Sequence, residues 1–482
     1  MAVLVAGAGP TGLVLACALL QRGVEVRVLD AAPEPARTSR ALGLQARGVE
    51  ILTRLGALGD LLERGLPVAR VRVHLGGRQI SEMRVGAAGG RGVIISQAEI
   101  EAALRRRLSE LGGKVEWGLA VTDAEQDAEQ VRVTVNGAEA VQADWLVGCD
   151  GAHSRVRKLA GIEFPGVPVI ERFLLADVRV DLGHAHDGAT TWLHRDGVFA
   201  AFALPGEHLW RLMADLPGSE EVTDVLAELQ RVLPVRTGLT GVRLDRAEWT
   251  STFRIQRRLA STYRRGRVLL AGDAAHIHSP FGGQGMNTGM GDAENLGWKL
   301  SLVQRWLAGE SLLDTYQAER RPVAEGVLST TTAATELLLA TDPVRRLLRD
   351  HAVLPLMNLP TVQNRIVRQA SQLDLTYRGG PLAPRTRFGA GPRLGDRVPS
   401  MCCARADGSL TSLHAELAGR WALVVGKGRP TPRVDRLGAD LVVLHGDQPD
   451  TLLVRPDAHL AWREHRSAAR LDAWLDNMLM RS

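Results

Sequence analysis

The sequence contains little of several residue types, and each shortage excludes a class of protein. Its 482 residues include four cysteines, with no Cys-x-x-Cys pair, so neither a disulfide framework nor a metal centre is indicated. Aromatic residues are only 4% of the chain, and 59 basic residues face 54 acidic ones, which argues against nucleic-acid binding. Apolar runs such as 13–20 are far shorter than the roughly 20 residues of a membrane span. We therefore expect a cytoplasmic enzyme that binds neither nucleic acid nor a membrane.

The first thirty residues carry a pattern that is typical of dinucleotide binding. An apolar strand over 3–6 precedes a glycine motif, which leads into a helix over 13–21 and a second strand that ends at Asp30. The first glycine permits a tight turn, the second lets the backbone approach a diphosphate, and the third lets helix and strand pack closely. The helix N-terminus would bind the phosphates, and Asp30 a ribose. The motif is Gly7-Ala8-Gly9-Pro10-Thr11-Gly12.

Two acidic residues beside glycines follow apolar, strand-like segments further along the chain. The first segment ends at Asp150-Gly151, and the second ends at Gly272-Asp273. The N-terminal motif alone does not distinguish NAD from FAD, but a plain NAD-dependent dehydrogenase would leave these residues without a role. The two segments are 145–149 and 268–271.

A glycine-rich loop at 280–287 follows the second of these motifs. Its glycines would let the backbone lie against the edge of a flavin ring. The N–H groups at the start of the next helix would stabilise negative charge on a reduced flavin. Together with the earlier motifs, the loop indicates a flavin enzyme.

With these motifs in order, the chain resembles the FAD-dependent aromatic hydroxylases, also called group A flavoprotein monooxygenases. This family includes para-hydroxybenzoate hydroxylase, phenol hydroxylase and the actinobacterial polyketide hydroxylases, and the last of these resemble the chain most. The resemblance covers nearly the whole chain. It implies that the ADP half of FAD is held by Gly7, Gly9, Pro10, Thr11, Gly12 and Asp30.

The resemblance also implies cofactor contacts outside the N-terminal motif. Arg40 and Arg47 would lie near the flavin and its phosphates, and Gln97 would contact the ribityl chain or a phosphate. Surface roles for the two arginines, and an ordinary polar role for Gln97 at its helix start, are the alternatives. The other implied cofactor contacts are Asp150 and Gly151, which would also serve the pyridine nucleotide, Asp273, which would bind the ribityl chain, and Gly283, Gly285, Met286 and Asn287.

Two residues are catalytic candidates by the same resemblance. The carbonyl of Pro280 would flank the flavin where oxygen reacts, and Arg47 would act beside it. The chain departs from phenol hydroxylase at Leu42, because that enzyme carries an acid near this position that helps to activate its phenol. The sequence therefore names no general base. His276 and His278 lack a third ligand at metal spacing, so local hydrogen bonding is favoured.

The implied reaction is the hydroxylation of a phenolic or polycyclic aromatic substrate, such as a polyketide or an antibiotic. NAD(P)H, with NADPH favoured, would reduce FAD, and O2 would then form a flavin C4a-hydroperoxide whose distal oxygen the ring attacks. The cofactor carries this chemistry, and the protein supplies orientation and exclusion of water. Two alternatives stay open: Baeyer–Villiger-type oxygenation of a polycyclic ketone, and a non-oxygenating flavin reductase or scaffold.

The resemblance implies an α/β fold with three parts: a glutathione-reductase-like (Rossmann-type) FAD-binding domain, an antiparallel substrate-binding sheet and a C-terminal thioredoxin-like domain. The last lacks a Cys-x-x-Cys motif, which favours a structural or subunit-contact role, for instance in a homodimer. The expected bounds are 1–170 and 253–378 for the FAD-binding domain, 171–252 with about 70–96 for the substrate sheet, 379–392 for a linker and 393–482 for the thioredoxin-like domain.

Hydrophobic periodicity predicts three helices whose outcomes bear on the site. One covers 49–62, and another covers 410–417. The third runs from about 287 to 308 and is expected to be amphipathic. Its apolar side would carry Met290, Ala293, Leu296, Leu300 and Val303.

Overall fold

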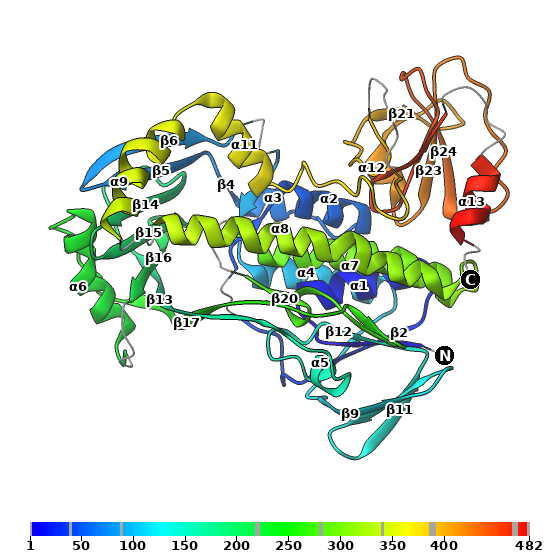
Figure 1. The fold of residues 1–482 in the computed structure, drawn as a ribbon, viewed down its shortest axis with the longest axis horizontal. Helices are drawn as coiled ribbons and strands as arrows, with labels where there is room; N and C mark the ends of the chain where they lie inside the picture. The colour runs from blue at the N-terminus through cyan, green and yellow to red at the C-terminus, as the bar shows by residue number, and fades with distance from the viewer. Residues whose placement is uncertain are drawn as a thin grey trace.

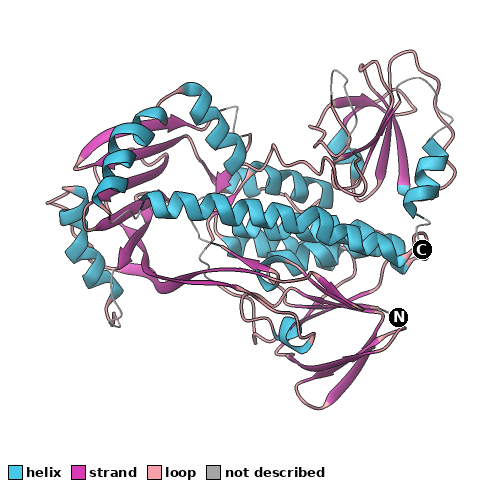
Figure 2. Ribbon diagram, viewed as in Figure 1, coloured by secondary structure: helices cyan, strands magenta, loops and turns pink. Residues whose placement is uncertain are grey.

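The computed structural model has an α/β fold in which a long helix, α8 (Asp314–Leu338), runs across the middle of the molecule (Figure 1). Figure 2 shows that helices pack beside strands in each part of the fold. Two predicted site residues, Arg40 and Pro280, lie outside the described residues. The structure describes residues 2–37, 41–86, 90–216, 222–278, 283–338, 342–384, 392–464 and 471–479.

A mainly parallel six-stranded sheet contains the N-terminal motif. Its order is β18-β19-β12-β1-β2-β8, and only β18 is antiparallel to its neighbour. The chain runs outward from β1 through β2 to β8 and then returns to the other side of β1, so the order reverses between β1 and β12. Ligands of open α/β sheets bind at such a reversal. The strands are β1 Val3–Ala6, β2 Val26–Asp30, β8 Val115–Trp117, β12 Trp145–Gly148, β18 Arg264–Arg265 and β19 Val268–Leu270.

A second, eight-stranded sheet has the order β20-β17-β13-β16-β15-β14-β5-β6. Two long strands, β13 and β17, connect it to the parallel sheet, and β5 and β6 come from the part of the chain before β13 (Figure 1). Helix α6 covers one face of this sheet. The strands are β5 Arg70–Leu75, β6 Arg78–Arg84, β13 Gly166–Arg179, β14 Gly188–His194, β15 Gly197–Ala203, β16 Leu209–Leu216, β17 Ala247–Leu259 and β20 His276–Ile277.

Helices surround the parallel sheet and extend from it to the eight-stranded one. None of the described helices is both long enough and apolar enough to cross a membrane. Before the C-terminal unit the helices are α1 Pro10–Leu20, α2 Ala46–Leu55, α3 Leu61–Arg64, α4 Gln97–Glu110, α5 Arg155–Leu159, α6 Val225–Thr237, α7 Gly285–Gln304, α8 Asp314–Leu338, α9 Pro343–Leu348, α10 Leu354–Leu356 and α11 Pro360–Ala370, with short turns η2 Gly272–Ala274, η3 Glu310–Leu313 and η4 Arg349–Val353.

The predicted helix over 49–62 is two helices. Gly56 follows α2 in the left-handed conformation, with φ of 69°, and its N–H bonds back to the last turn, so that the chain leaves the helix there. The segment resumes as the single turn α3. Because the apolar pattern continues past Gly56, it did not indicate that α2 ends there.

Helix α7 is buried on nearly every side, so the expectation of an amphipathic helix is wrong. It packs against α1, α2 and α8. A Cβ on Gly297 would lie 2.8 Å from the Cβ of Ala18, and one on Gly289 would lie 2.4 Å from Oγ1 of Thr11. Glycine at these two positions therefore allows α1 and α7 to approach closely. Asn287, Asp292 and Lys299 of α7 bond to other protein groups instead of solvent.

The C-terminal unit is a six-stranded mixed sheet, drawn orange to red in Figure 1. The predicted helix over 410–417 is wrong in its first part, which pairs with β21 as a strand before the chain turns into α12. Its elements are β21 Cys402–Ala404, β22 Leu410–Ser412, α12 Leu413–Leu417, β23 Trp421–Val425, η5 Gly438–Asp440, β24 Leu441–His445, β25 Leu452–Val454, β26 Leu460–Arg463 and α13 Leu471–Leu479.

Two small sheets complete the fold. An antiparallel sheet of order β11-β10-β9 lies beside α5, and another of order β3-β7-β4 lies near the start of α2. Their strands are β3 Gly43–Leu44, β4 Leu66–Pro67, β7 Val93–Ile94, β9 Val121–Gln126, β10 Val131–Val135 and β11 Glu139–Ala143.

Candidate functional site

Four segments that are distant in sequence meet at the carboxyl edge of the parallel sheet. Gly7 follows β1, Asp30 ends β2, Asp150 comes two residues after β12, and Gly272-Asp273 follows β19. These strands are parallel neighbours, so their carboxyl ends share one edge. The structure therefore brings together the acidic and glycine residues that the sequence placed in separate motifs.

The three glycines of the N-terminal motif have different surroundings. Gly7 has φ of 105°, and a Cβ there would lie 2.3 Å from the carbonyl oxygen of Cys149. A Cβ on Gly12 would lie 2.0 Å from the carbonyl oxygen of Gly7. A Cβ on Gly9 would meet no heavy atom within 4 Å. Gly7 and Gly12 thus close the loop against the sheet, while Gly9 faces open space.

The N-terminus of α1 is available to an anion. The helix starts at Pro10, whose missing N–H suits this position, and Gly9 before it offers no side-chain cap. The first turn carries no acidic residue. Its N–H groups and the positive end of the helix dipole can therefore bind a phosphate. Thr11, another predicted contact, lies in this turn.

Asp30 holds the same loop from the neighbouring strand. Its Oδ2 accepts a hydrogen bond from the N–H of Ala8 at 2.7 Å, and its Oδ1 accepts one from Ala32 at 2.8 Å. Each carboxylate oxygen can accept a second hydrogen bond. Asp30 can therefore fix the glycine loop and still accept a hydroxyl group of a ribose.

Asp150 caps the helix that follows it. Its oxygens accept hydrogen bonds from the Ser154 hydroxyl at 2.5 Å and from the N–H groups of Arg155 at 2.7 Å and Val156 at 3.1 Å. Gly151 has φ of 76°, in the left-handed region that glycine adopts without strain. Asp150 therefore stabilises the start of α5 at the same edge of the sheet.

Asp273 lies in η2, which follows β19, and its side chain is exposed. Gly272 before it has φ of 62°, and a Cβ there would lie 2.5 Å from Oγ1 of Thr11. The loop is therefore packed directly against the start of α1, with the Asp273 side chain left open to a ligand.

A buried carboxylate, Asp292 of α7, anchors the Asp273 loop. Its Oδ2 accepts hydrogen bonds from the N–H of Gly272 at 3.2 Å and pairs with Nε2 of His276 at 2.6 Å. Nε of Arg320 donates to Oδ1 at 2.7 Å. The local hydrogen bonding expected for His276 is confirmed. Sequence reasoning missed Asp292 and Arg320, because acidic residues of a helix read as solvent-facing until their partners are known.

The start of α7 adds a second helix N-terminus to the site region. Asn287 is fully buried, and its Nδ2 donates to the carbonyl of Gly43 at 2.9 Å while its Oδ1 accepts from the N–H of Gln45 at 3.0 Å. Nε2 of Gln45 donates to the carbonyl of Gly283 at 3.1 Å. The predicted residues Gly283, Gly285, Met286 and Asn287 are therefore joined to the segment before α2. Gln45, for which no role was predicted from sequence, makes this connection.

Gln97 begins α4 and bonds within its own helix. Its Nε2 donates to Oε1 of Glu101 at 2.7 Å. Glu101 is buried, and its burial raises the pKa of the carboxyl group, whereas Gln97 acts to lower it. Asp30 also acts on this carboxyl, so α4 begins close to the sheet edge described above.

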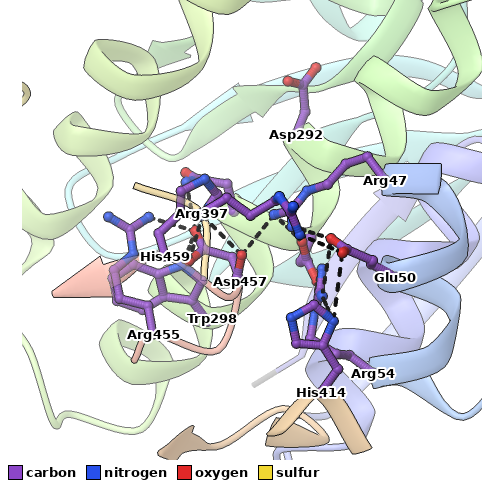
Figure 3. Close-up of polar contacts among 12 residues, drawn as sticks. Arg47, Glu50, Arg54, Asp292, Trp298, Arg397, His414, Arg455, Asp457 and His459 are labelled. Carbon is purple, nitrogen blue, oxygen red and sulfur yellow. Dashed lines mark hydrogen bonds and ion pairs between the residues drawn. The ribbon is translucent and has the colours of Figure 1, made fainter. Parts of the chain in front are cut away.

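Arg47 makes its side-chain contacts with a different set of residues. Its guanidinium is buried, donates to Glu50 at 3.0 Å and Glu294 at 3.3 Å, and donates to the backbone carbonyl of Asp457 at 2.7 Å (Figure 3). These partners bind the guanidinium on the side of the molecule where Asp457 of the C-terminal unit packs. The structure therefore does not bring the Arg47 side chain to the other predicted site residues.

The eight-stranded sheet offers an apolar surface on the face opposite α6. Phe173, Leu175 and Met213 are buried there, and Phe202 and Phe253 beside them are only partly covered. Flat aromatic side chains with remaining exposure suit an aromatic ligand. The residues on this face follow from the strand register, which sequence alone did not fix.

A groove of about 640 Å³ lies between α8 and α11. It extends to Gln284, the residue that precedes α7, and exposed Arg365 and Arg368 line its outer part. Its volume is within the range of small-molecule sites. The groove thus reaches from the surface to the helix start that belongs to the candidate cofactor site.

Comparison with known proteins agrees with this geometry. Residues 1–331 match the family described as FAD binding domain. The chain is 38% identical to the 12-dehydrotetracycline 5-monooxygenase/anhydrotetracycline 6-monooxygenase of Streptomyces rimosus subsp. rimosus, over 95% of this chain and 94% of that protein.

Solved structures with the same fold include two with different reactions. The anhydrotetracycline hydroxylase OxyS from Streptomyces rimosus has a TM-score of 0.81 and 33% identity, covering 100% of this chain and 99% of that one. A Diels-Alderase from the biosynthetic pathway of pyrroindomycins also has a TM-score of 0.81, with 30% identity and 98% coverage of both chains. The chain belongs to the FAD binding domain family and is an FAD-dependent monooxygenase.

Proposed function

We propose that this monooxygenase hydroxylates a polycyclic aromatic compound of the polyketide or antibiotic type, with NAD(P)H, and NADPH in preference, as reductant and O2 as co-substrate. The observation that carries the proposal is the meeting of Gly7, Asp30, Asp150 and Asp273 at one edge of the parallel sheet. The similarity to an anhydrotetracycline monooxygenase supports the substrate class. The apolar aromatic face of the eight-stranded sheet supports a flat substrate.

The residues present fit FAD. Gly9 leaves open the space beside the N-terminus of α1, where a diphosphate would bind to backbone N–H groups. Asp30 would bind the adenosine ribose with its remaining lone pairs. The exposed side chain of Asp273 would bind the ribityl hydroxyls. We also propose that Asp150, Gly151 and Gln97 contribute to this site, as the family resemblance implies.

FAD, when bound, supplies the acceptance of hydride from the reductant and the activation of oxygen. The N–H groups at the start of α7 would stabilise negative charge that develops on the ring system. Gly283 and Gly285 allow close backbone approach there, and the buried Asn287 holds that helix start in place. Met286 would contact FAD, as the family resemblance implies. Pro280 and Arg40 keep the roles that the resemblance implies.

We assign Arg47 to holding the fold together and give it no catalytic role. Its guanidinium is 4% exposed and pairs with two carboxylates and a backbone carbonyl. These three partners hold its guanidinium between α2, α7 and the C-terminal unit.

We propose a glutathione-reductase-like domain over 1–170 and 253–378, a substrate sheet over 171–252 with 70–96, a linker over 379–392 and a thioredoxin-like domain over 393–482. The reversal of strand order at β1 supports the first. In the last, β24-β23-β25-β26 pairs one parallel and two antiparallel neighbours, which supports the assignment. All four cysteines are free, which supports a reducing, cytoplasmic location.

The test must separate hydroxylation from a reaction that inserts no oxygen, because the Diels-Alderase shares this fold over nearly the whole chain. NADPH consumption separates the two. Protein loaded with FAD should oxidise NADPH faster when an anhydrotetracycline-like phenol is added, and the product should contain an additional hydroxyl group. Conversion to an isomer without NADPH consumption would contradict the proposed hydroxylation. A lactone or ester product would indicate Baeyer–Villiger chemistry.

A further inference from the structure

The turn between β25 and β26 inserts charged side chains into the interior of the molecule. Arg455, Asp457 and His459 are each at most 1% exposed, although connections between strands usually lie at the surface. Figure 3 shows these side chains gathered beside Trp298 of α7. We call residues 455–459 the inserted turn.

The inserted turn bonds directly to the two long helices. Oδ2 of Asp457 accepts hydrogen bonds from Nδ2 of Asn295 at 3.1 Å and from Nε1 of Trp298 at 3.2 Å, both in α7. The Arg455 guanidinium makes two hydrogen bonds to Glu319 of α8, at 2.7 and 2.8 Å. A paired arrangement of this kind fixes orientation as well as distance.

The same turn also contacts α2. Its Asp457 carbonyl accepts a hydrogen bond from Arg47, and Arg47 pairs in turn with Glu294 of α7. Helices α2 and α7 both begin at the candidate cofactor site, where Gln45 and Asn287 join them. One turn of the C-terminal unit therefore holds three helices, two of which start beside the expected flavin.

A chain of buried contacts leads from the inserted turn to the Asp273 loop. The ring of His459 lies 4.2 Å from the ring of Tyr377, measured between centroids. The Tyr377 hydroxyl accepts a hydrogen bond from Arg320 at 3.0 Å, and Arg320 donates to Asp292 at 2.7 Å. Asp292 accepts the N–H of Gly272, the residue before Asp273.

We propose that Asp457 and Arg455 are positioning residues of the flavin site. They set the placement of α7, α8 and, through Arg47, α2, and so they determine how the α7 N-terminus and the Asp273 loop meet FAD. The inference rests on the proposed placement of FAD at these elements. It gives the C-terminal unit a part in the reaction centre that a purely structural or subunit-contact role does not include.

The test compares a variant of the inserted turn with a control variant in the same C-terminal unit. Asp457→Asn removes the charge but keeps the shape, and Leu444→Ala opens a cavity in the core of the same C-terminal sheet without touching the inserted turn. FAD dissociation constants, visible absorption spectra and flavin midpoint potentials are measured on holoenzymes well below their melting temperatures. We expect Asp457→Asn to weaken FAD binding about three- to tenfold and to shift the spectrum and the potential. Leu444→Ala should change only the melting temperature.

Equal FAD affinity, spectrum and potential in the two variants would overturn the proposal, while failure of the wild-type protein to bind FAD would instead overturn the proposed function. Arg455→Lys keeps the charge beside Glu319 but loses the paired geometry, and it should shift the same properties. If neither substituted protein folds, hydrogen exchange of the wild-type protein decides. Adding FAD should increase protection at the inserted turn but not at β22; equal protection of both would contradict the proposal.

Discussion

At the scale of single residues, two glycines of the N-terminal motif have different surroundings. A Cβ on Gly12 would lie 2.0 Å from a backbone oxygen, whereas a Cβ on Gly9 would meet nothing within 4 Å. Gly9 has φ of −72° and ψ of −179°, an extended conformation that alanine also adopts. The two positions should therefore respond differently to the same substitution.

Gly9→Ala should fold normally and lose FAD. Its added methyl group has room in the protein, but it occupies the space beside the α1 N-terminus where the diphosphate would bind. Gly12→Ala should instead destabilise the protein by about 1–3 kcal/mol, as overpacked sites typically do. Thermal unfolding and FAD titration of both variants test this. A Gly9→Ala protein that binds FAD as tightly as the wild type would contradict the assignment.

Asp273→Ala should weaken FAD binding by about 10- to 100-fold, because hydrogen bonds to a charged group contribute about 1.5–3 kcal/mol. The side chain is exposed, so the fold should tolerate the change. Fluorescence titration with FAD measures the effect. Asp407→Ala, at an exposed position of the C-terminal unit, is the matched control and should leave the dissociation constant unchanged. An unchanged constant in both variants would remove Asp273 from the site.

Residues that act at a strand end could be predicted from sequence. Asp30, Asp150 and Asp273 each follow an apolar strand, and parallel strands align such ends at one edge. Arg47 could not be interpreted in this way. Its partners Glu294 and Asp457 lie more than 240 residues away, and no local pattern reveals them.

At the scale of elements, α7 shows what helical periodicity leaves out. The spacing of its apolar residues predicted a helix, but the opposite side, which carries Asp292, Glu294 and Lys299, is also buried. The buried side carries glycines that contact α1 and carboxylates that pair with distant cations. In the sequence alone, such residues give the same amphipathic pattern as a side that faces solvent. Periodicity thus predicts the element but not its surroundings.

Two helix glycines should give opposite results when replaced by alanine. Gly326 of α8 is exposed, and a Cβ there would meet no atom within 4 Å, so Gly326→Ala should stabilise the protein by about 0.5–1 kcal/mol. Gly297→Ala should destabilise it, because the added Cβ would lie 2.8 Å from the Cβ of Ala18. Urea unfolding measures both. Destabilisation by Gly326→Ala, or tolerance of Gly297→Ala, would contradict the described helix packing.

At the scale of the whole molecule, buried ion pairs join the C-terminal unit to the rest of the fold. Burial alone would raise the pKa of Glu319, but Arg455 and Lys299 lower it to about 2. Burial and the nearby Arg54 lower the pKa of His414 to about 3. Arg455 and His414 come from the C-terminal unit, so its attachment depends on the protonation of these groups.

Acid should weaken this attachment in two pH windows. Unfolded His414 binds a proton below about 6.5, while the folded side chain stays neutral to about 3, so stability falls as the pH decreases through this window. Glu319 stabilises the folded state above about 4.5, and that contribution is lost as the pH falls toward about 2. His414→Gln should flatten unfolding free energy against pH in the upper window, and Glu319→Gln in the lower. Unchanged slopes would contradict the assigned pairs.

The central claim is oxygen insertion by an FAD-dependent enzyme, and labelled dioxygen tests it most directly. The FAD-loaded protein is supplied with NADPH, an anhydrotetracycline-like phenol and isotopically labelled O2, and the product is analysed by mass spectrometry. We predict that one labelled oxygen atom appears in a new ring hydroxyl group. A product without label, including one whose new oxygen atom comes from the unlabelled water, would contradict the claim and leave a flavoprotein of another function.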